Sequence, residues 1–306
     1  MSMLESKRRR LVHVAWITVV AIILYSTVRL LPTGTNLSHM DFRPGGSSVE
    51  FCDPANPQFM PVIAVRSPVT MTLVSAETAS VGREVRVIAV LKTASGKPIT
   101  PDDLLVVHTQ KLHLLVIDPA LSDYQHLHPQ PGKNAGEWEF VFTPRRTGLY
   151  RIFADFTPAA TARGLYASAD LKVDALSSEG METVPIANNR TYEENGYTFE
   201  LQTTVEPWKA GRMIDLTFIV SRRDGGPVTL QPVMGAFAHL VAFDAARSGY
   251  AHLHPNEIDL TRPLDSHRPR LTFKLTIPRA GRYVIWSQVI LGGREVFAPF
   301  WFEVVE

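Results

Sequence analysis

The chain has 306 residues, of which 45% are apolar, 9% aromatic and 20% charged. This length indicates two domains, and the composition is too apolar for a disordered chain. Its 31 basic and 30 acidic residues create no net field that would attract a phosphate backbone, so nucleic-acid binding is disfavoured. The single cysteine excludes an internal disulfide, a multi-cysteine zinc site and a cysteine-ligated iron–sulfur cluster.

The N-terminus predicts a membrane anchor. Leu11 to Val28 are 18 residues without a charge, and Arg29 can snorkel to the interface so that Leu30 and Leu31 extend the span. As a helix, residues 11–31 would rise roughly 30 Å, which matches the hydrocarbon core of a bilayer. Lys7 to Arg10 precede the stretch, so residues 1–10 should form a cytoplasmic tail and the rest should be exported. The alternative is a cleaved signal peptide, but no small-x-small cleavage site follows, and a retained single-pass anchor in a bacterial inner membrane is favoured.

The segment after the anchor, residues 32–59, is rich in Gly, Pro, Ser and Asn. This composition predicts an extended tether. Cys52 lies in it, about twenty residues beyond the apolar stretch, which is too far for a lipoprotein cysteine. A metal ligand remains open for Cys52, although an incidental cysteine is the favoured interpretation.

The exported part predicts two tandem immunoglobulin-like antiparallel β-sandwiches, at residues 60–175 and 191–306, with a polar linker at 176–190. Short runs that alternate with period two, or that are fully apolar, are bounded by turn residues throughout both halves. The fold class is therefore mainly β after one N-terminal transmembrane helix. The predicted strands are 69–75, 84–92, 111–118, 136–143, 148–156, 165–173, 197–205, 213–221, 236–244, 270–277, 281–291 and 294–305.

The two halves repeat one another in sequence. Leu112 to Asp118 followed by Gln125 to Pro129 is echoed by Ala238 to Asp244 followed by Ala251 to Pro255, at a constant offset of 126 residues. Duplication of an ancestral domain explains this match. The repeat brings six of the ten histidines to matched positions, as two triads: His113, His126 and His128 in the first copy, and His239, His252 and His254 in the second.

Each triad has the pattern of a metal chelate. In a strand, residues i and i+2 point to the same face about 6–7 Å apart, and a hairpin could bring His113 or His239 beside its His-x-His pair. Three imidazoles suit copper, zinc or nickel, and the lack of a cysteine speaks against a blue-copper centre. A structural hairpin element is an equally open interpretation. Asp118 and Asp244 would orient the ligands in the first case and form turns in the second.

At these residues the sequence resembles a group of exported bacterial β-sandwich domains that carry a His-Leu-His-Pro motif. The resemblance covers about residues 100–174 and 230–306, and it implies an association with heavy-metal handling. Asp155 stands where the second copy has Gln288, so the two copies have diverged on a late strand.

No sequence motif indicates an enzyme: there is no nucleophile elbow, no phosphate-binding glycine loop and no His-Glu-x-x-His sequence. Our first interpretation is a non-enzymatic, membrane-anchored periplasmic accessory or scaffold subunit that contacts the bilayer and integral subunits of a bacterial membrane complex. The host would be respiratory or photosynthetic, and a general resemblance implies an accessory subunit of a reaction-centre and antenna assembly. The alternative is a membrane-anchored periplasmic copper- or zinc-binding protein that uses the two triads.

Overall fold

The computed structural model describes residues 3–30, 37–42, 59–64, 67–175 and 187–306. The chain forms two compact units, Met1–Asn36 and Leu37–Glu306, and each is described by itself. Cys52, most of the expected tether and most of the expected linker lie outside the described residues.

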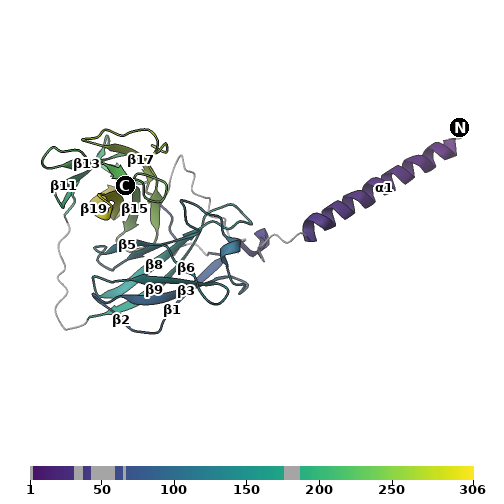
Figure 1. Cartoon of the computed structure of the whole chain (residues 1–306), viewed down its shortest axis with the longest axis horizontal. Coiled ribbons are helices and arrows are strands. Elements are labelled where there is room, and N and C mark those ends of the chain that lie inside the picture. Colours follow the sequence, from purple (N-terminus) through teal and green to yellow (C-terminus); the bar gives the residue numbers. More distant parts are fainter. Residues whose placement is uncertain (1–2, 31–36, 43–58, 65–66, 176–186) are drawn as a thin grey trace. The chain divides into compact units, whose positions relative to one another are not determined.

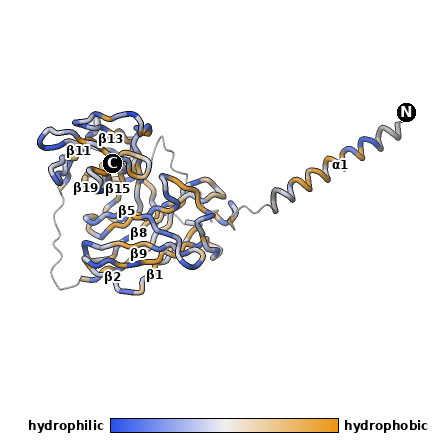
Figure 2. The backbone as a smooth tube through the Cα atoms, in the orientation of Figure 1, coloured by the Kyte–Doolittle hydropathy of each residue, from blue (hydrophilic) through white to orange (hydrophobic). Residues whose placement is uncertain are grey.

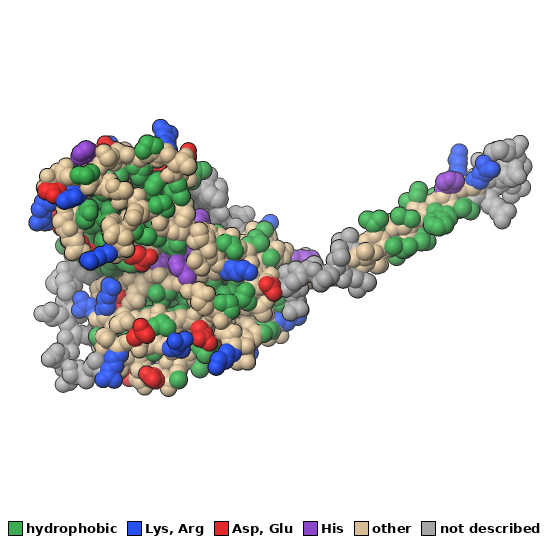
Figure 3. All heavy atoms as spheres, in the orientation of Figure 1, with side chains coloured by type: hydrophobic (Ala, Val, Ile, Leu, Met, Phe, Trp, Pro, Cys, Tyr) green, Lys and Arg blue, Asp and Glu red, His purple; other side chains and the backbone are tan. Residues whose placement is uncertain are grey.

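The first unit contains the helix α1 (Met3–Leu30). Its segment Arg9–Thr27 is long and apolar enough to cross a membrane, and none of that segment is buried. Hydrophobic side chains gather along the middle of α1, with basic residues towards its N-terminal end (Figure 3). The backbone of α1 coloured by hydropathy shows hydrophobic residues along the same part of the helix (Figure 2). The hydroxyls of Thr18 and Thr27 donate to the carbonyls of Val14 and Ile23. Such bonds satisfy polar groups inside the helix, as a span through hydrocarbon requires.

The first sandwich pairs a four-stranded sheet with a five-stranded sheet (Figure 1). The strands alternate between buried and exposed residues, as in β3, because one face of each sheet covers the core. In order across the first sheet, the strands are β1 (Val69–Ser75), β3 (Val85–Thr93), β7 (Glu137–Phe142) and β6 (Gln130–Pro131); across the second they are β2 (Ala79–Ser80), β9 (Leu165–Asp174), β8 (Gly148–Phe156), β4 (Leu112–Ile117) and β5 (Tyr124–Leu127).

The second sandwich repeats this plan around its own core. Its first sheet has the order β10 (Thr191–Glu194), β11 (Tyr197–Thr203), β13 (Met213–Arg222) and β17 (Arg270–Thr276). Its second sheet has the order β12 (Trp208–Lys209), β19 (Arg294–Val305), β18 (Gly281–Leu291), β15 (His239–Asp244) and β16 (Tyr250–Leu253), and β14 (Leu230–Gln231) also pairs with β18. Two short 3-10 helices, η1 (His39–Phe42) and η2 (Pro101–Asp103), complete the elements of the second unit.

The structure confirms a mainly β chain with two tandem sandwiches of antiparallel sheets after one apolar helix. Each predicted strand overlaps an observed one. The strands that the sequence did not predict have only two to four residues: β2, β5, β6, β10, β12, β14 and β16. Runs this short offer too few positions for a period of two to define a strand, although β5 and β16 each carry a histidine of the His-x-His pairs that were considered in strand geometry.

A third apolar cluster joins the sandwiches through the sheets that contain β4 and β15. All six residues of β4 are buried. Leu114 and Val116 enter the core of the first sandwich, whereas Leu115 and Ile117 pack with Val241, Phe243 and other residues of the second sandwich. Burial on both faces thus explains why β4 is apolar except for His113.

Candidate metal centre

Two hairpins position the histidines that the sequence singled out. In β4 and β5, Leu114 pairs with Leu127 and Leu115 with His126, which places His113 across from His128. The β15–β16 hairpin has the same register, with Leu240 paired to Leu253 and Val241 to His252. The structure therefore brings together the members of each expected triad. Ring centroids lie 4.9–5.3 Å apart in the first triad and 4.7–5.5 Å apart in the second.

The two triads meet in one cluster between the sandwiches. The rings of His126 and His252 are 5.3 Å apart, and those of His113 and His252 are 5.8 Å apart. Only the packing of one sandwich on the other makes these contacts, and the repeat in the sequence does not encode them locally.

A seventh histidine, His108, also belongs to this cluster, and sequence reasoning missed it. His108 lies in a turn of the first sandwich, with a φ of 49°, and its ring stacks on that of His254 in the second sandwich at a centroid distance of 3.6 Å. Potential ligand atoms of His108, His239 and His254 all lie within 4.8 Å of one another, and the same holds for His113, His126 and His128. His108 is not repeated as a histidine in the second copy, so the search for matched residues passed over it.

One ring nitrogen of His113 and one of His126, called the outer nitrogens below, form hydrogen bonds to oxygen acceptors. His113 Nε2 lies 3.0 Å from the carbonyl oxygen of Val107, and His126 Nδ1 lies 2.9 Å from Gln288 Oε1. The amide nitrogen of Gln288 donates to Glu295 at 3.3 Å, which keeps its oxygen towards His126. Both outer ring nitrogens must therefore carry the hydrogen of a neutral imidazole.

The inner nitrogens of the same two rings, His113 Nδ1 and His126 Nε2, then face each other with lone pairs at 3.1 Å. Two lone pairs at this distance repel unless a proton or a cation lies between them. Two ligands that bind one zinc ion at about 2.05 Å and at a tetrahedral angle lie about 3.3 Å apart. The spacing of this pair is therefore close to that of two ligands on one metal ion.

Other ring nitrogens of the cluster are buried without a hydrogen-bond partner among the described residues. They are His128 Nε2, both nitrogens of His239, His252 Nε2 and His254 Nε2. A buried polar atom without a partner costs about 1–3 kcal/mol. Five such ring nitrogens lie in this one cluster, and buried polar atoms in native structures are normally satisfied by protein groups, ordered water or ions.

Burial keeps these imidazoles neutral. It is the main cause that lowers the pKa of each of the seven rings, and repulsion from neighbouring imidazoles lowers the pKa of His126 and His239 further. Burial also raises the pKa of Asp155, whose Oδ2 lies 3.3 Å from His252 Nδ1. Metals bind neutral imidazole, so the rings need not lose a proton at neutral pH.

Asp118 and Asp244 form turns at the far ends of their strands. Asp118 accepts the backbone N–H groups of Ala120, Ser122 and Asp123, and Asp244 accepts that of Ser248 at 2.6 Å. Of the two roles that the sequence left open for them, the structure supports the turn.

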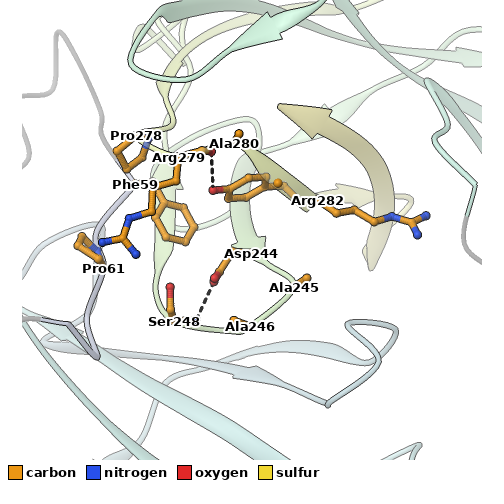
Figure 4. Close-up of a pocket in the computed structure, with 12 residues that line it drawn as sticks. Phe59, Pro61, Asp244, Ala245, Ala246, Ser248, Pro278, Arg279, Ala280 and Arg282 are labelled. Atoms are coloured by element: carbon orange, nitrogen blue, oxygen red, sulfur yellow. Dashed lines mark hydrogen bonds between the residues drawn. The ribbon is translucent and has the colours of Figure 1, made fainter. Parts of the chain in front are cut away.

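A pocket of about 320 Å³ lies at the Asp244 end of β15, opposite the end that carries His239 (Figure 4). Phe59, Asp244, Arg279 and Tyr283 are among its lining residues. Tyr283 donates to the carbonyl of Arg279, and Arg282 is directed away from the other labelled side chains (Figure 4). The pocket includes no histidine and is separate from the cluster.

A family model described as Domain of unknown function (DUF8832) matches the chain twice, at residues 64–173 and 191–306. No curated protein sequence matches the chain.

Several solved structures are similar at low sequence identity. A Corynebacterium diphtheriae protein described as membrane anchored is 9% identical, with 78% of this chain and 59% of that protein covered and a TM-score of 0.25. Salmonella alpha-2-macroglobulin, as a point mutant and as the protein reacted with methylamine, is 15% identical, with 78% of this chain and 15% of that protein covered and a TM-score of 0.25. The chain thus spans less than two thirds of each of these proteins, and TM-scores this low carry no information on function.

Proposed function

The chain belongs to the DUF8832 family through both of its sandwich domains, and from this premise we propose that it is a membrane-anchored protein that binds a transition-metal ion, copper or zinc, in the histidine cluster. His113, His126 and His128 would hold one ion, and His108, His239 and His254 have the spacing to hold a second. Imidazole is a good ligand for both metals.

The observation that carries the proposal is the buried pair of facing nitrogens, His113 Nδ1 and His126 Nε2, 3.1 Å apart. Their outer nitrogens are held by Val107 and Gln288. Backbone carbonyls and side-chain oxygens at this position orient metal-ligating histidines and fix their tautomers. The arrangement supports a ligand pair prepared for a cation.

A purely structural role for the histidines explains the cluster less well. A hairpin needs no buried ring nitrogen that lacks a partner, and apolar residues at these positions would stabilise it without that cost. His239 is fully buried, yet neither of its ring nitrogens has a partner among the described residues. Retaining a polar ring at such a position is costly unless the ring binds something.

The test is metal binding by the full-length chain in detergent. The protein is stripped with a chelator, reloaded with copper or zinc, and analysed by mass spectrometry of the metal and by competition titration. We expect stoichiometric metal and a clear loss of affinity in His126→Ala and in His239→Ala. His267→Ala is the matched control, because His267 is an exposed histidine outside the cluster. Failure of the unmutated chain to bind either metal would refute the proposal.

The apolar helix supports the second part of the proposal, a location at the membrane with the sandwiches in the periplasm. No residue of Arg9–Thr27 is buried within the described unit, so its apolar side chains need a bilayer or other helices around them. We also propose a non-enzymatic accessory role within a respiratory or photosynthetic membrane complex, with integral subunits as partners. Purification from native membranes in mild detergent tests this role: integral subunits should co-purify, and a chain that migrates alone would contradict it.

A further inference from the structure

The turn that carries His108 has an exact counterpart in the second sandwich. Val107 and Gln110 exchange two backbone hydrogen bonds, of 2.8 and 3.1 Å, and Val233 and Ala236 do the same at 2.7 and 3.0 Å. The residue that follows the valine has a φ of 49° at His108 and of 48° at Met234. The two turns also stand at the repeat offset of 126 residues. Met234 therefore leaves its turn in the same direction, relative to its own sandwich, as His108 does.

The sandwiches pack with an approximate two-fold relationship, because contacts from one to the other occur in matched pairs. Each pair joins repeat-equivalent residues with the sandwiches exchanged, and the two distances of a pair differ by 0.8 Å at most. On the late strands, Phe153 corresponds to Trp286, because they stand two residues before Asp155 and Gln288, and Tyr166 corresponds to Phe297, because they pair with Asp155 and Gln288. The pairs of ring-centroid distances are His113–His252 (5.8 Å) with His126–His239 (6.2 Å), Tyr124–Trp286 (6.0 Å) with Phe153–Tyr250 (5.2 Å), and Tyr124–Phe297 (5.7 Å) with Tyr166–Tyr250 (5.6 Å).

This relationship places Met234 opposite the first triad. His108 crosses to the second sandwich and stacks on His254, and the same operation takes Met234 to His128, the repeat equivalent of His254. The two turns adjoin, since a Cβ built on Gly235 would lie 3.9 Å from Thr109 Cγ2. Met234 is half-buried, and His128 Nε2 is buried without a partner among the described residues.

We infer that the thioether of Met234 is a ligand of the metal ion held by His113, His126 and His128, and that this site selects copper in its cuprous state. The inference rests on the proposed function and adds the identity of the ion. It also makes the two sites unequal, because the site of His108, His239 and His254 would bind through nitrogen alone.

The chemistry of the ligands supports this selectivity. Thioether sulfur is soft and uncharged, and it favours Cu(I) over the harder Zn(II). Imidazole binds a metal ion as the neutral ring, so the three histidines add no negative charge to the site. A set of neutral ligands in a desolvated site suits a monovalent ion better than a divalent one.

The test compares Met234→Leu with the unmutated full-length chain in detergent under anaerobic conditions. Copper(I) affinity is measured by competition with a coloured chelator, and bound sulfur is detected by X-ray absorption at the copper edge. We expect a sulfur ligand that disappears in Met234→Leu, with a loss of copper(I) affinity of at least about tenfold, since even residues that only orient a ligand contribute about 10–100-fold. Zinc affinity should change little.

Three further variants test whether the sulfur ligand is Met234. Met213→Leu alters a methionine that is about half exposed, on β13, and should leave the sulfur signal unchanged. Cys52→Ser removes the thiol of the single cysteine and should also leave the sulfur signal unchanged, because the inferred ligand is a thioether. Met234→His makes the two turns alike and should exchange sulfur for nitrogen while metal is retained. Copper bound by nitrogen alone in the unmutated chain, with unchanged affinity in Met234→Leu, would overturn the inference and leave the proposed function standing. Failure to bind any metal would overturn both.

Discussion

Asp155 and Gln288 occupy the same position in the two sandwiches, and each contacts a histidine of the other sandwich. Gln288 Oε1 lies 2.9 Å from His126 Nδ1, and Asp155 Oδ2 lies 3.3 Å from His252 Nδ1. His126 and His252 are themselves repeat equivalents. Each sandwich therefore orients a candidate ligand of its partner, with a neutral amide on one side and a carboxylate on the other.

The first prediction concerns this orienting contact. Gln288→Leu removes the acceptor that fixes His126, so metal affinity at the first triad should fall by about 10–100-fold, as for other residues that orient a ligand. Competition titration of the full-length chain measures the change. Gln202→Leu alters a glutamine on β11 that donates to Glu200, and it should leave the affinity unchanged. Equal affinities in the two variants would show that Gln288 does not orient a ligand.

The second prediction uses His108 as a link between the sandwiches. Because His108 belongs to the first sandwich and His239 and His254 to the second, one ion bound by all three holds the sandwiches together. Metal at a hundredfold excess over its dissociation constant should stabilise the folded chain by about 2.7 kcal/mol per site. Thermal unfolding with and without metal measures the gain, and His108→Ala should reduce it. If metal stabilises His108→Ala against thermal unfolding as much as it stabilises His267→Ala, His108 is not a ligand.

The third prediction concerns the close approach of two backbones at Gly249. A Cβ at this position would lie 1.8 Å from the carbonyl oxygen of Met60, which accepts the Tyr250 N–H at 3.1 Å. Gly249→Ala should therefore destabilise the fold by about 1–3 kcal/mol, the usual cost of forcing atoms into a packed site.

Denaturant unfolding measures this cost, with Gly226→Ala as the matched control. A Cβ on Gly226 meets the side-chain atoms Asp224 Oδ1 at 3.1 Å and Arg222 Cζ at 3.2 Å, which can move aside, so a change within about 0.5 kcal/mol is expected. Similar midpoints for the two variants would contradict the close approach.

The fourth prediction concerns pH. A hydrogen bond from Lys97, at 2.6 Å, and one from the backbone of Ser38 lower the pKa of Asp41 from 3.8 to about 2. A depressed carboxyl pKa contributes stability that is present above about pH 4 and is lost as the pH falls through 2. Asp41→Asn should therefore be less stable than the unmutated chain at pH 7, and the difference should vanish near pH 2.

Urea unfolding at a series of pH values follows this difference. Asp174→Asn breaks a surface ion pair with Lys172 and should have an effect of about 1 kcal/mol or less at every pH. A difference for Asp41→Asn that stays constant from pH 7 to pH 2 would be inconsistent with the shifted pKa.

Local sequence determined the elements and the two hairpins. The run of Leu112 to Ile117, apolar except for His113, and the alternation in β3 were sufficient to predict strands, because a strand shows its burial with a period of two or as a continuous apolar run. The His-x-His spacing and a hairpin to the preceding strand suggested that His113 could join His126 and His128, and the register of β4 and β5 agrees. Whether these residues bind metal stays a prediction.

Tertiary packing alone decided how the histidines assemble into one cluster. His108 joins His254, and Gln288 joins His126, across an interface between residues that are 146 and 162 positions apart in sequence. That interface depends on the summed burial of side chains such as Leu115, Phe153 and Phe243. No short segment of the sequence indicates which face of a sheet the other sandwich will cover. Hydrophobic association is non-directional, so the sequence determined each half of the site, and only the shape of the packed faces decided that the halves meet.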